Sequence, residues 1–162
     1  ARSHEQMSFK FVKTDLYSQI EKTLKPMRQA YARELVLEGN GPAMAVTDGE
    51  KLRQLLFILL DNARKYSDDL IKTTIEEREE GFSITSVDYG TGIPEDALPY
   101  VFDRFYRVEE DRSRKTGGTG LGLAIAKELA DGLGAQLKVE SIYGMGTTVR
   151  IFIPKDQILT GF

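Results

Sequence analysis

The 162-residue sequence contains no cysteine, and this absence excludes several kinds of site. The chain has no disulfide, no thiolate metal ligand and no cysteine nucleophile. Its longest hydrophobic run, Leu55 to Leu60, is far shorter than the roughly 20 residues of a membrane-spanning helix. No charged segment followed by an apolar one resembles a signal peptide. We therefore expect no direct membrane contact from this chain, and any membrane anchor of a parent protein to lie elsewhere.

A strong excess of charge is also missing. The net charge is -3 and the pI about 5.3, so nothing global favours a nucleic-acid partner. The length and the 41% of hydrophobic residues are typical of one globular domain, which we expect to be a monomer when isolated. We interpret residues 1–8 as a disordered linker or a cloning remnant, residues 9–156 as the domain and residues 157–162 as a tail.

Apolar periodicity predicts an α+β two-layer sandwich, in which about three helices cover one face of a mixed, mostly antiparallel sheet. The first helix follows Asp15 and ends near Tyr31. Thr47-Asp48-Gly49-Glu50 has the form of a capping box for a second helix, from Asp48 to Tyr66. A third helix runs from Thr119 to Asp131 and closes on Gly132 and Gly134. The predicted strands, which share short apolar runs or alternation, are 10–13, 35–37, 43–46, 71–78, 82–88, 136–141 and 147–153.

Turn chemistry in Gly39-Asn40-Gly41-Pro42 predicts that strands 35–37 and 43–46 form a hairpin. Residues 89–118 form a long segment, rich in glycine and charge, with short helical pieces near 95–100 and 102–106. A loop of this length inside a compact domain is usually functional, and commonly a lid.

One edge of the second helix carries Asn62, Lys65 and Tyr66, together with Ile58. A neutral Asn oxygen suits Mg²⁺ that already carries a triphosphate, because it adds no negative charge. Lys65 can contact the phosphates, and Tyr66 can stack on a base. Alternatively, these residues are simply the polar end of a helix.

Asp88 ends a predicted strand, and Gly90 and Gly92 follow in a segment where backbone could approach a ligand closely. By period-two parity Asp88 points into the apolar layer beneath the helices, where a carboxylate needs a donor such as an adenine amino group. The alternative is a strand-ending Asp in a turn.

The segment from Gly117 to Leu123 opens the third helix, and free N–H groups at a helix start favour bound phosphate. A dinucleotide-binding fold is the alternative, because Glu109 or Asp111 lies about 20 residues after Gly90. That fold needs a second apolar strand, but residues 101–111 are charged and aromatic.

Two further observations concern the long segment and the last strand. Arg112 or Arg114 could fold over a γ-phosphate when a lid closes, or belong to a solvated loop of mixed charge. Thr147 lies on the same face of its predicted strand as the alternating apolar residues. Its hydroxyl should therefore face the layer that holds Asp88 and support that carboxylate.

Taken together, five segments resemble the N, G1, F, G2 and G3 boxes of bacterial sensor histidine kinases, in the order of that family. They are 61–67 (DNARKYS), 88–94 (DYGTGIP), 102–107 (FDRFYR), 118–123 (GTGLGL) and 144–147 (GMGT). The resemblance implies the ATP-binding sandwich shared with DNA gyrase, MutL and the large heat-shock chaperones. It implies that Asn62 binds Mg²⁺, that Asp88 binds adenine and that residues 89–118 are the ATP lid. The nucleotide contacts predicted on this basis are Asn62, Lys65, Tyr66, Asp88, Gly90, Gly92, Ile93, Thr119, Gly120, Leu121, Gly122, Leu123 and Thr147.

The sequence departs from the family at Ile58, where histidine kinases often have another Asn and the ATPase relatives have a Glu that activates water. Isoleucine can do neither, so efficient hydrolysis is disfavoured. Ser3-His4-Glu5 resembles the start of a histidine box, but Gln6-Met7-Ser8 does not continue it. We therefore interpret His4 as incidental, and the phosphoacceptor histidine as absent from this chain.

The function expected from the resemblance is binding of Mg-ATP and transfer of its γ-phosphoryl group to a histidine. That histidine would lie on a separate dimerisation domain of the same parent, which passes the group to a response regulator. We expect a cytoplasmic domain of a membrane-anchored parent. The alternatives are a nucleotide-gated ATPase of the gyrase or chaperone class and a catalytically silent nucleotide-binding module.

Overall fold

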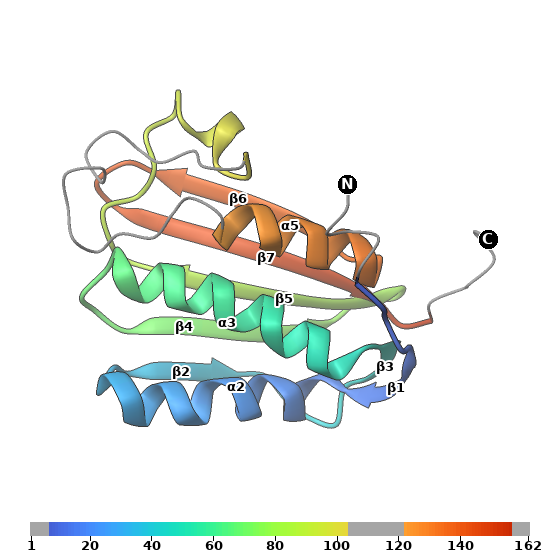
Figure 1. The fold of residues 1–162 in the computed structure, drawn as a ribbon. Coiled ribbons are helices and arrows are strands. Elements are labelled where there is room, and N and C mark those ends of the chain that lie inside the picture. Colours follow the sequence, from blue (N-terminus) through green and yellow to red (C-terminus); the bar gives the residue numbers. More distant parts are fainter. Residues whose placement is uncertain (1–6, 104–121, 157–162) are drawn as a thin grey trace.

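A computed structural model describes residues 7–103 and 122–156, which form an α+β sandwich of two layers (Figure 1). One layer is a five-stranded sheet with the order β2-β4-β5-β7-β6, in which β2 and β4 are parallel and the other pairs antiparallel. Its strands are β2 (Leu35–Glu38), β4 (Ile71–Glu77), β5 (Gly81–Asp88), β6 (Gln136–Ile142) and β7 (Gly146–Pro154). The other layer consists of α2 (Leu16–Tyr31), α3 (Gly49–Lys65) and α5 (Gly122–Leu133), all on one face of the sheet (Figure 1). This arrangement confirms the predicted fold class.

The predicted hairpin of residues 35–37 and 43–46 is wrong. The first segment, β2, pairs with β4, whereas the second, β3 (Met44–Thr47), pairs with β1 (Val12–Asp15) in a separate two-stranded sheet. Two hydrogen bonds hold the start of β3 beside the end of β1: the Ala43 N–H donates to the side-chain carboxylate of Asp15 at 2.9 Å, and the Leu16 N–H donates to the Ala43 carbonyl at 2.7 Å. The turn residues between β2 and β3 therefore join two sheets.

Helix α3 begins one residue later than a capping box starting at Thr47 would require. The N-cap is Asp48, whose Oδ1 accepts from the Lys51 N–H at 3.0 Å and whose Oδ2 accepts from the Lys10 N–H at 2.8 Å. Thr47 belongs to β3 instead, and its buried hydroxyl has no hydrogen-bond partner among the described residues. A carboxylate accepts both bonds at once, which favours Asp48 as the cap.

Helix α5 continues through Gly132, contrary to the prediction, and ends at Leu133. Gly134 follows with φ +72°, the left-handed conformation that commonly ends a helix. A Cβ at Gly132 would overlap the ring of Phe9, so this glycine allows the N-terminal segment to pack on α5. The predicted helical piece near residues 95–100 is a 3-10 turn, η1 (Leu98–Tyr100), and most of the piece near 102–106 lies outside the described residues.

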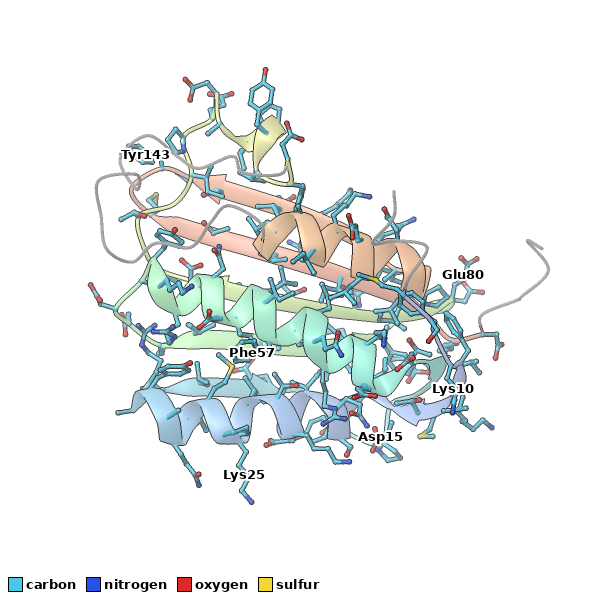
Figure 2. The ribbon with its side chains drawn as sticks, viewed as in Figure 1. Lys10, Asp15, Lys25, Phe57, Glu80 and Tyr143 are labelled. Carbon is cyan, nitrogen blue, oxygen red and sulfur yellow. The ribbon has the colours of Figure 1, made fainter. Side chains whose placement is uncertain are left out.

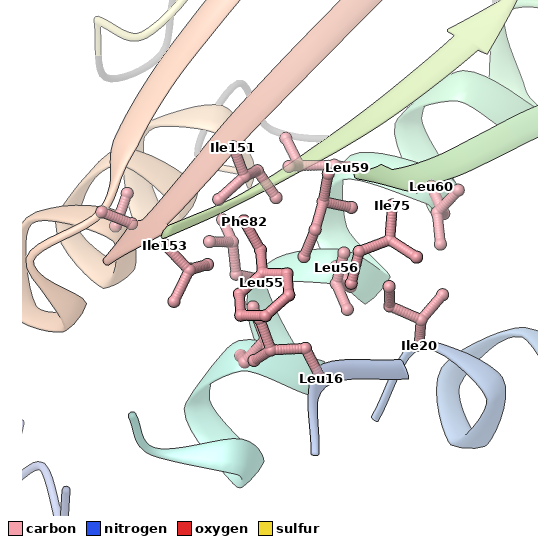
Figure 3. Packing of buried hydrophobic residues seen from close by; sticks show 14 of the residues in the cluster. Leu16, Ile20, Leu55, Leu56, Leu59, Leu60, Ile75, Phe82, Ile151 and Ile153 are labelled. Atoms are coloured by element: carbon pink, nitrogen blue, oxygen red, sulfur yellow. The ribbon is translucent and has the colours of Figure 1, made fainter. Parts of the chain in front are cut away.

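The hydrophobic core fills the space between the helices and the sheet. Figure 3 shows leucines of α3 packed between Leu16 and Ile20 of α2 and the strand residues Phe82 and Ile151. Its fully buried side chains include Leu55, Leu60, Ile71, Ile84, Leu129 and Ile153. In the described part of the chain, no helix is both long and apolar enough to cross a membrane.

Candidate functional site

A single row of paired residues crosses the sheet at the end where β5 stops. The residues of this row, in spatial order, are Leu35, Ile71, Asp88, Thr147 and Ser141. Figure 2 shows Tyr143, in the turn between β6 and β7, at the same end of the molecule as the C-terminal end of α3. Two predicted site residues, Asp88 and Thr147, thus lie directly beside each other.

Asp88 has an exposed fraction of 7%, which confirms its predicted inward orientation. Its Oδ1 accepts a hydrogen bond from the backbone N–H of Gly90 at 2.9 Å. Burial raises the pKa of the Asp88 carboxyl, whereas backbone hydrogen bonds from Gly90 and Thr147 and the charge of Arg33 lower it; burial has the larger effect. A buried carboxylate gains from a further donor, and a ligand amino group would provide one.

The segment after Asp88 is held between the end of α3 and the turn that joins β6 to β7. The Thr91 N–H donates to the Tyr66 carbonyl at 3.3 Å, and the Thr91 carbonyl accepts from the Gly144 N–H at 2.6 Å. A Cβ at Gly90 would overlap the Tyr66 carbonyl oxygen, and Gly92 has φ +75°. The glycines therefore allow close contact with the protein's own backbone, and their predicted contact with a ligand stays a prediction.

The predicted polar edge of α3 exists, but its lysine is already paired. Asn62, Lys65 and Tyr66 are each half-buried. The Lys65 ammonium lies 3.4 Å from one carboxylate oxygen of Asp61, and Arg64 lies 2.7 Å from the other. A phosphate contact by Lys65 would therefore compete with Asp61, an exchange that is inexpensive because partly exposed ion pairs contribute little.

The start of α5 lies beside this edge of α3. The Ile58 Cγ2 atom is 3.8 Å from where a Cβ of Gly122 would stand, an ordinary contact distance. Ile58, one helical turn before the predicted N box, thus lies next to Gly122 of the predicted G2 box. Leu123 packs against the hydrophobic core, so a ligand contact from this residue would have to come from its backbone. Thr119, Gly120, Leu121, Arg112 and Arg114 lie outside the described residues.

A hollow with a volume of 690 Å³ opens beside the end of β5. Its lining residues are Tyr66, Ser67, Asp68, Asp69, Tyr89, Gly90, Thr91, Tyr143 and Gly144. The three tyrosines suit a flat ring, whereas Asp68 and Asp69 would repel phosphates. Asn62, Lys65 and Asp88 lie outside the lining that the described residues form. The hollow therefore suits an uncharged ring better than a phosphate group.

Thr147 occupies the predicted position but has a different hydroxyl partner. Its hydroxyl lies 3.1 Å from Ser141 Oγ, while its backbone acts on the Asp88 carboxyl. Ser141 Oγ also donates to the Gly146 carbonyl at 2.8 Å and accepts from the Ile93 N–H at 2.7 Å. Ser141 thus connects the segment after Asp88 to β7, a role that its place in an alternating strand did not reveal.

Two relatives share much of this sequence. Residues 47–157 match the family model described as "Histidine kinase-, DNA gyrase B-, and HSP90-like ATPase". The chain is 42% identical over 150 residues to the sensor histidine kinase YkoH of Bacillus subtilis, a match that covers 92% of this chain and 33% of YkoH. It is 44% identical over 114 residues to sensor histidine kinase WalK of the same organism, covering 68% of this chain and 19% of WalK. The chain thus spans a third or less of the length of these relatives.

Solved structures have the same fold. Mycobacterial sensor histidine kinase MprB superposes with a TM-score of 0.75 at 25% identity, over 92% of this chain and 100% of that one. The catalytic domain of histidine kinase ThkA gives a TM-score of 0.76 at 21% identity, over 92% and 99% of the two chains, and shows the fold alone. The chain belongs to the histidine kinase-, DNA gyrase B- and HSP90-like ATPase family, as a catalytic domain of the sensor histidine kinase type.

Proposed function

We propose that this chain binds Mg-ATP and donates the γ-phosphoryl group to a histidine on a separate dimerisation domain, which passes it to a response regulator. The observation that carries the proposal is the buried Asp88 carboxyl, held by the Gly90 N–H at the end of β5. Membership of an ATPase family supports the nucleotide. The names of YkoH and WalK, both sensor histidine kinases, support the phosphoryl transfer.

Asp88 supplies the base selectivity in this proposal. The exocyclic amino group of adenine donates hydrogen bonds, whereas guanine has a carbonyl oxygen at the same ring position. An ionised Asp88 accepts from the first and repels the second. The half-buried ring of Tyr66, at the end of α3, offers a flat surface for the base.

Asn62 fits one ligand of a Mg²⁺ that arrives with the phosphates. Among the described residues, no group of three or more His, Cys, Asp or Glu side chains could hold a metal ion. Asn62 is half-buried, and Ile58, one turn earlier, is apolar, so this edge of α3 offers the metal a neutral oxygen. A bound Mg²⁺ would neutralise charge that develops on the phosphate oxygens.

The chemistry needs no base from this chain. A ring nitrogen of the acceptor histidine bonds to the γ-phosphorus while the bond to the β–γ bridging oxygen breaks, so ADP leaves with the electron pair. The attacking nitrogen uses its lone pair, and the proton on the other ring nitrogen passes to a base of the partner domain. Ile58 cannot activate water, which disfavours hydrolysis as a competing reaction.

We propose the dimerisation domain of the same parent protein as the first partner and the response regulator as the second. The chain covers 33% of YkoH, and a relative of that length has room for further domains. A place for this domain on the cytoplasmic side of a membrane-anchored parent is part of the same proposal.

Incubation of the chain with γ-labelled ATP and the purified dimerisation domain of the same parent tests the proposal. We expect acid-labile label on that domain, lost in Asp88→Asn and retained in Gln54→Asp, a change at an exposed position of α3. Steady-state hydrolysis without transfer would favour the gyrase-type ATPase. Tight ADP binding without either reaction would favour a silent nucleotide-binding module.

A further inference from the structure

Arg33 makes a dense set of hydrogen bonds at the end of the sheet where Asp88 lies. It follows Ala32, the left-handed residue with φ 49° that ends α2, and precedes β2. One terminal nitrogen, Nη1, donates to the Ser67 hydroxyl at 3.0 Å and to the Asp69 carbonyl at 3.1 Å. The other, Nη2, donates to the Arg64 carbonyl at 3.0 Å and to the Ser67 carbonyl at 2.6 Å. The guanidinium group thus binds the turn between α3 and β4.

One acceptor of Arg33, the Arg64 carbonyl, belongs to the C-terminal end of α3, where helix carbonyls lack partners within the helix. Ser67 satisfies one of them, because its hydroxyl donates to the Ala63 carbonyl at 2.6 Å. Arg33 satisfies the next carbonyl, that of Arg64, and also the carbonyls of Ser67 and Asp69 in the turn. A positive charge at this place also interacts favourably with the negative end of the helix dipole.

The turn that Arg33 holds is the one against which the segment after Asp88 packs. Tyr66 lies in this turn, and its carbonyl oxygen accepts from Thr91 and contacts Gly90. Gly90 in turn donates to the Asp88 carboxylate. A continuous chain of short contacts therefore runs from Arg33 through the turn to Asp88.

Arg33 also acts on Asp88 by its charge, which lowers the pKa of that carboxyl against the effect of burial. The other charged groups nearby are paired with one another or exposed to solvent. On α3, Asp61 pairs with Arg64 and Lys65, and in the turn the side chains of Asp68 and Asp69 are exposed. Among the described residues, Arg33 is the group whose charge favours ionised Asp88.

We propose that Arg33 is a positioning residue of the nucleotide site, which holds the α3–β4 turn against the Gly90 segment and keeps Asp88 ready to accept from adenine. This proposal rests on the function proposed above, in which Asp88 binds the base. Arg33 touches no nucleotide in this scheme and acts through Ser67, Tyr66 and Asp88. Its bonds are of a kind that lysine cannot reproduce, because a guanidinium group donates from two nitrogens in a fixed plane.

The test compares ADP affinity by calorimetry in the 162-residue chain, Arg33→Met, Arg33→Lys and Arg28→Met. Arg28 is the matched control, since its Nε donates to the Leu35 carbonyl at 2.8 Å and its guanidinium lies 3.4 Å from Glu21, and neither of these partners belongs to the α3–β4 turn. We expect Arg33→Met to weaken ADP about tenfold at neutral pH and Arg28→Met to leave affinity unchanged.

The pH profile separates positioning from a general loss of stability. Without the Arg33 charge the pKa of Asp88 rises further, so as the pH is lowered ADP affinity should begin to decline at a higher pH than in the parent chain. The nucleotide phosphates titrate equally in every variant and cancel in the comparison. Arg33→Lys should restore the parent pH profile but not the full affinity, and it remains informative if Arg33→Met does not fold.

Asp88→Asn, measured in parallel, distinguishes the two proposals. If Asp88→Asn leaves ADP affinity unchanged, the proposed function itself is wrong. If Asp88→Asn weakens ADP whereas the folded Arg33 variants keep both the affinity and the pH profile of the parent, the role of Arg33 is overturned.

Discussion

Gly90 lies directly against the backbone carbonyl oxygen of Tyr66, so closely that a Cβ at residue 90 would overlap that oxygen. The contact joins the segment after Asp88 to the end of α3, and the hydrogen bond from Thr91 to the same carbonyl, at 3.3 Å, reinforces it. The missing side chain at residue 90 therefore sets the distance between the adenine-binding and metal-binding parts of the proposed site.

Gly90→Ala should separate these two parts. Overpacking against a backbone atom that cannot move aside typically lowers the free energy of unfolding by about 1–3 kcal/mol, and we expect about tenfold weaker ADP binding as well. Urea denaturation and calorimetry measure the two effects.

Gly81→Ala is the control for this change. A Cβ at Gly81 would overlap the backbone carbonyl oxygen of Ile153, at the opposite end of β5 from Asp88. Alanine there should lower the free energy of unfolding by about 1–3 kcal/mol and leave ADP affinity close to that of the parent. An equal loss of affinity in the two variants would contradict the role given to the contact between Gly90 and Tyr66.

The sequence predicts the elements of this fold better than their pairing. Local apolar spacing is sufficient to predict α3 and β5, because the residues that determine each of these elements lie within the element itself. The partner of β2 is decided by Leu35 packing beside Ile71, which is remote in the chain, so the turn after β2 was misleading. The choice of Asp48 as the N-cap likewise depends on the N–H of distant Lys10.

The same distinction holds within the site. The alternation of residues along β5 is a local property, and it correctly predicted that Asp88 points inward. Arg33 could not be predicted, because most of its acceptors are backbone carbonyls, which every residue has. Ser141 was missed for a related reason, since one partner of its hydroxyl is the Ile93 N–H. A contact between a side chain and the backbone of a distant residue leaves no pattern of residue types that could be recognised in the sequence.

Asp88→Asn should weaken ADP about 10- to 150-fold, the effect of losing a hydrogen bond to a charged acceptor, and should change GDP affinity much less. Asparagine still accepts from the Gly90 N–H, so the local turn is retained. Calorimetry with both nucleotides measures the selectivity. Equal losses for ADP and GDP would show that Asp88 does not recognise the base.

The same variant should be more stable than the parent at neutral pH. Burial raises the pKa of Asp88 above its ordinary value of 3.8, so the folded protein binds this proton more tightly than the unfolded chain does. Above the raised pKa, ionised Asp88 therefore lowers the free energy of unfolding. This loss disappears as the pH falls through the raised pKa towards 3.8. Thermal unfolding should show a Tm advantage of a few degrees for Asp88→Asn at neutral pH, declining in acid. A constant advantage would indicate a cause other than ionisation.

Asn62→Asp should abolish Mg²⁺-dependent nucleotide binding, because it adds a negative charge beside the phosphates. The matched control is Gln54→Asp, which adds the same charge at an exposed position of the same helix. We expect the control to bind Mg-ADP as the parent does, whereas Asn62→Asp should lose at least about tenfold in affinity. Calorimetry of Mg-ADP against both variants decides, and unchanged affinity in Asn62→Asp would remove this residue from the metal site.

Ile58→Asn should make nucleotide binding less dependent on a high Mg²⁺ concentration. The new amide would stand one helical turn before Asn62 and offer the metal a second neutral oxygen in place of a water. Ile58 also packs against the hydrophobic core, so the free energy of unfolding should fall by about 1 kcal/mol. The measurement is the Mg²⁺ concentration that gives half-maximal ADP binding, which we expect to fall several-fold.

Ile58→Leu is the control for that measurement, because leucine has the branched shape of asparagine and, like it, lacks the Cγ2 atom of isoleucine, but adds no oxygen. The Ile58 Cγ2 atom lies near Gly122, so a merely steric effect on the start of α5 should appear in both variants. A metal effect should appear in Ile58→Asn alone. If both variants shift the Mg²⁺ dependence equally, the side chain at residue 58 acts by packing on α5, and the altered metal shell inferred from this position is wrong.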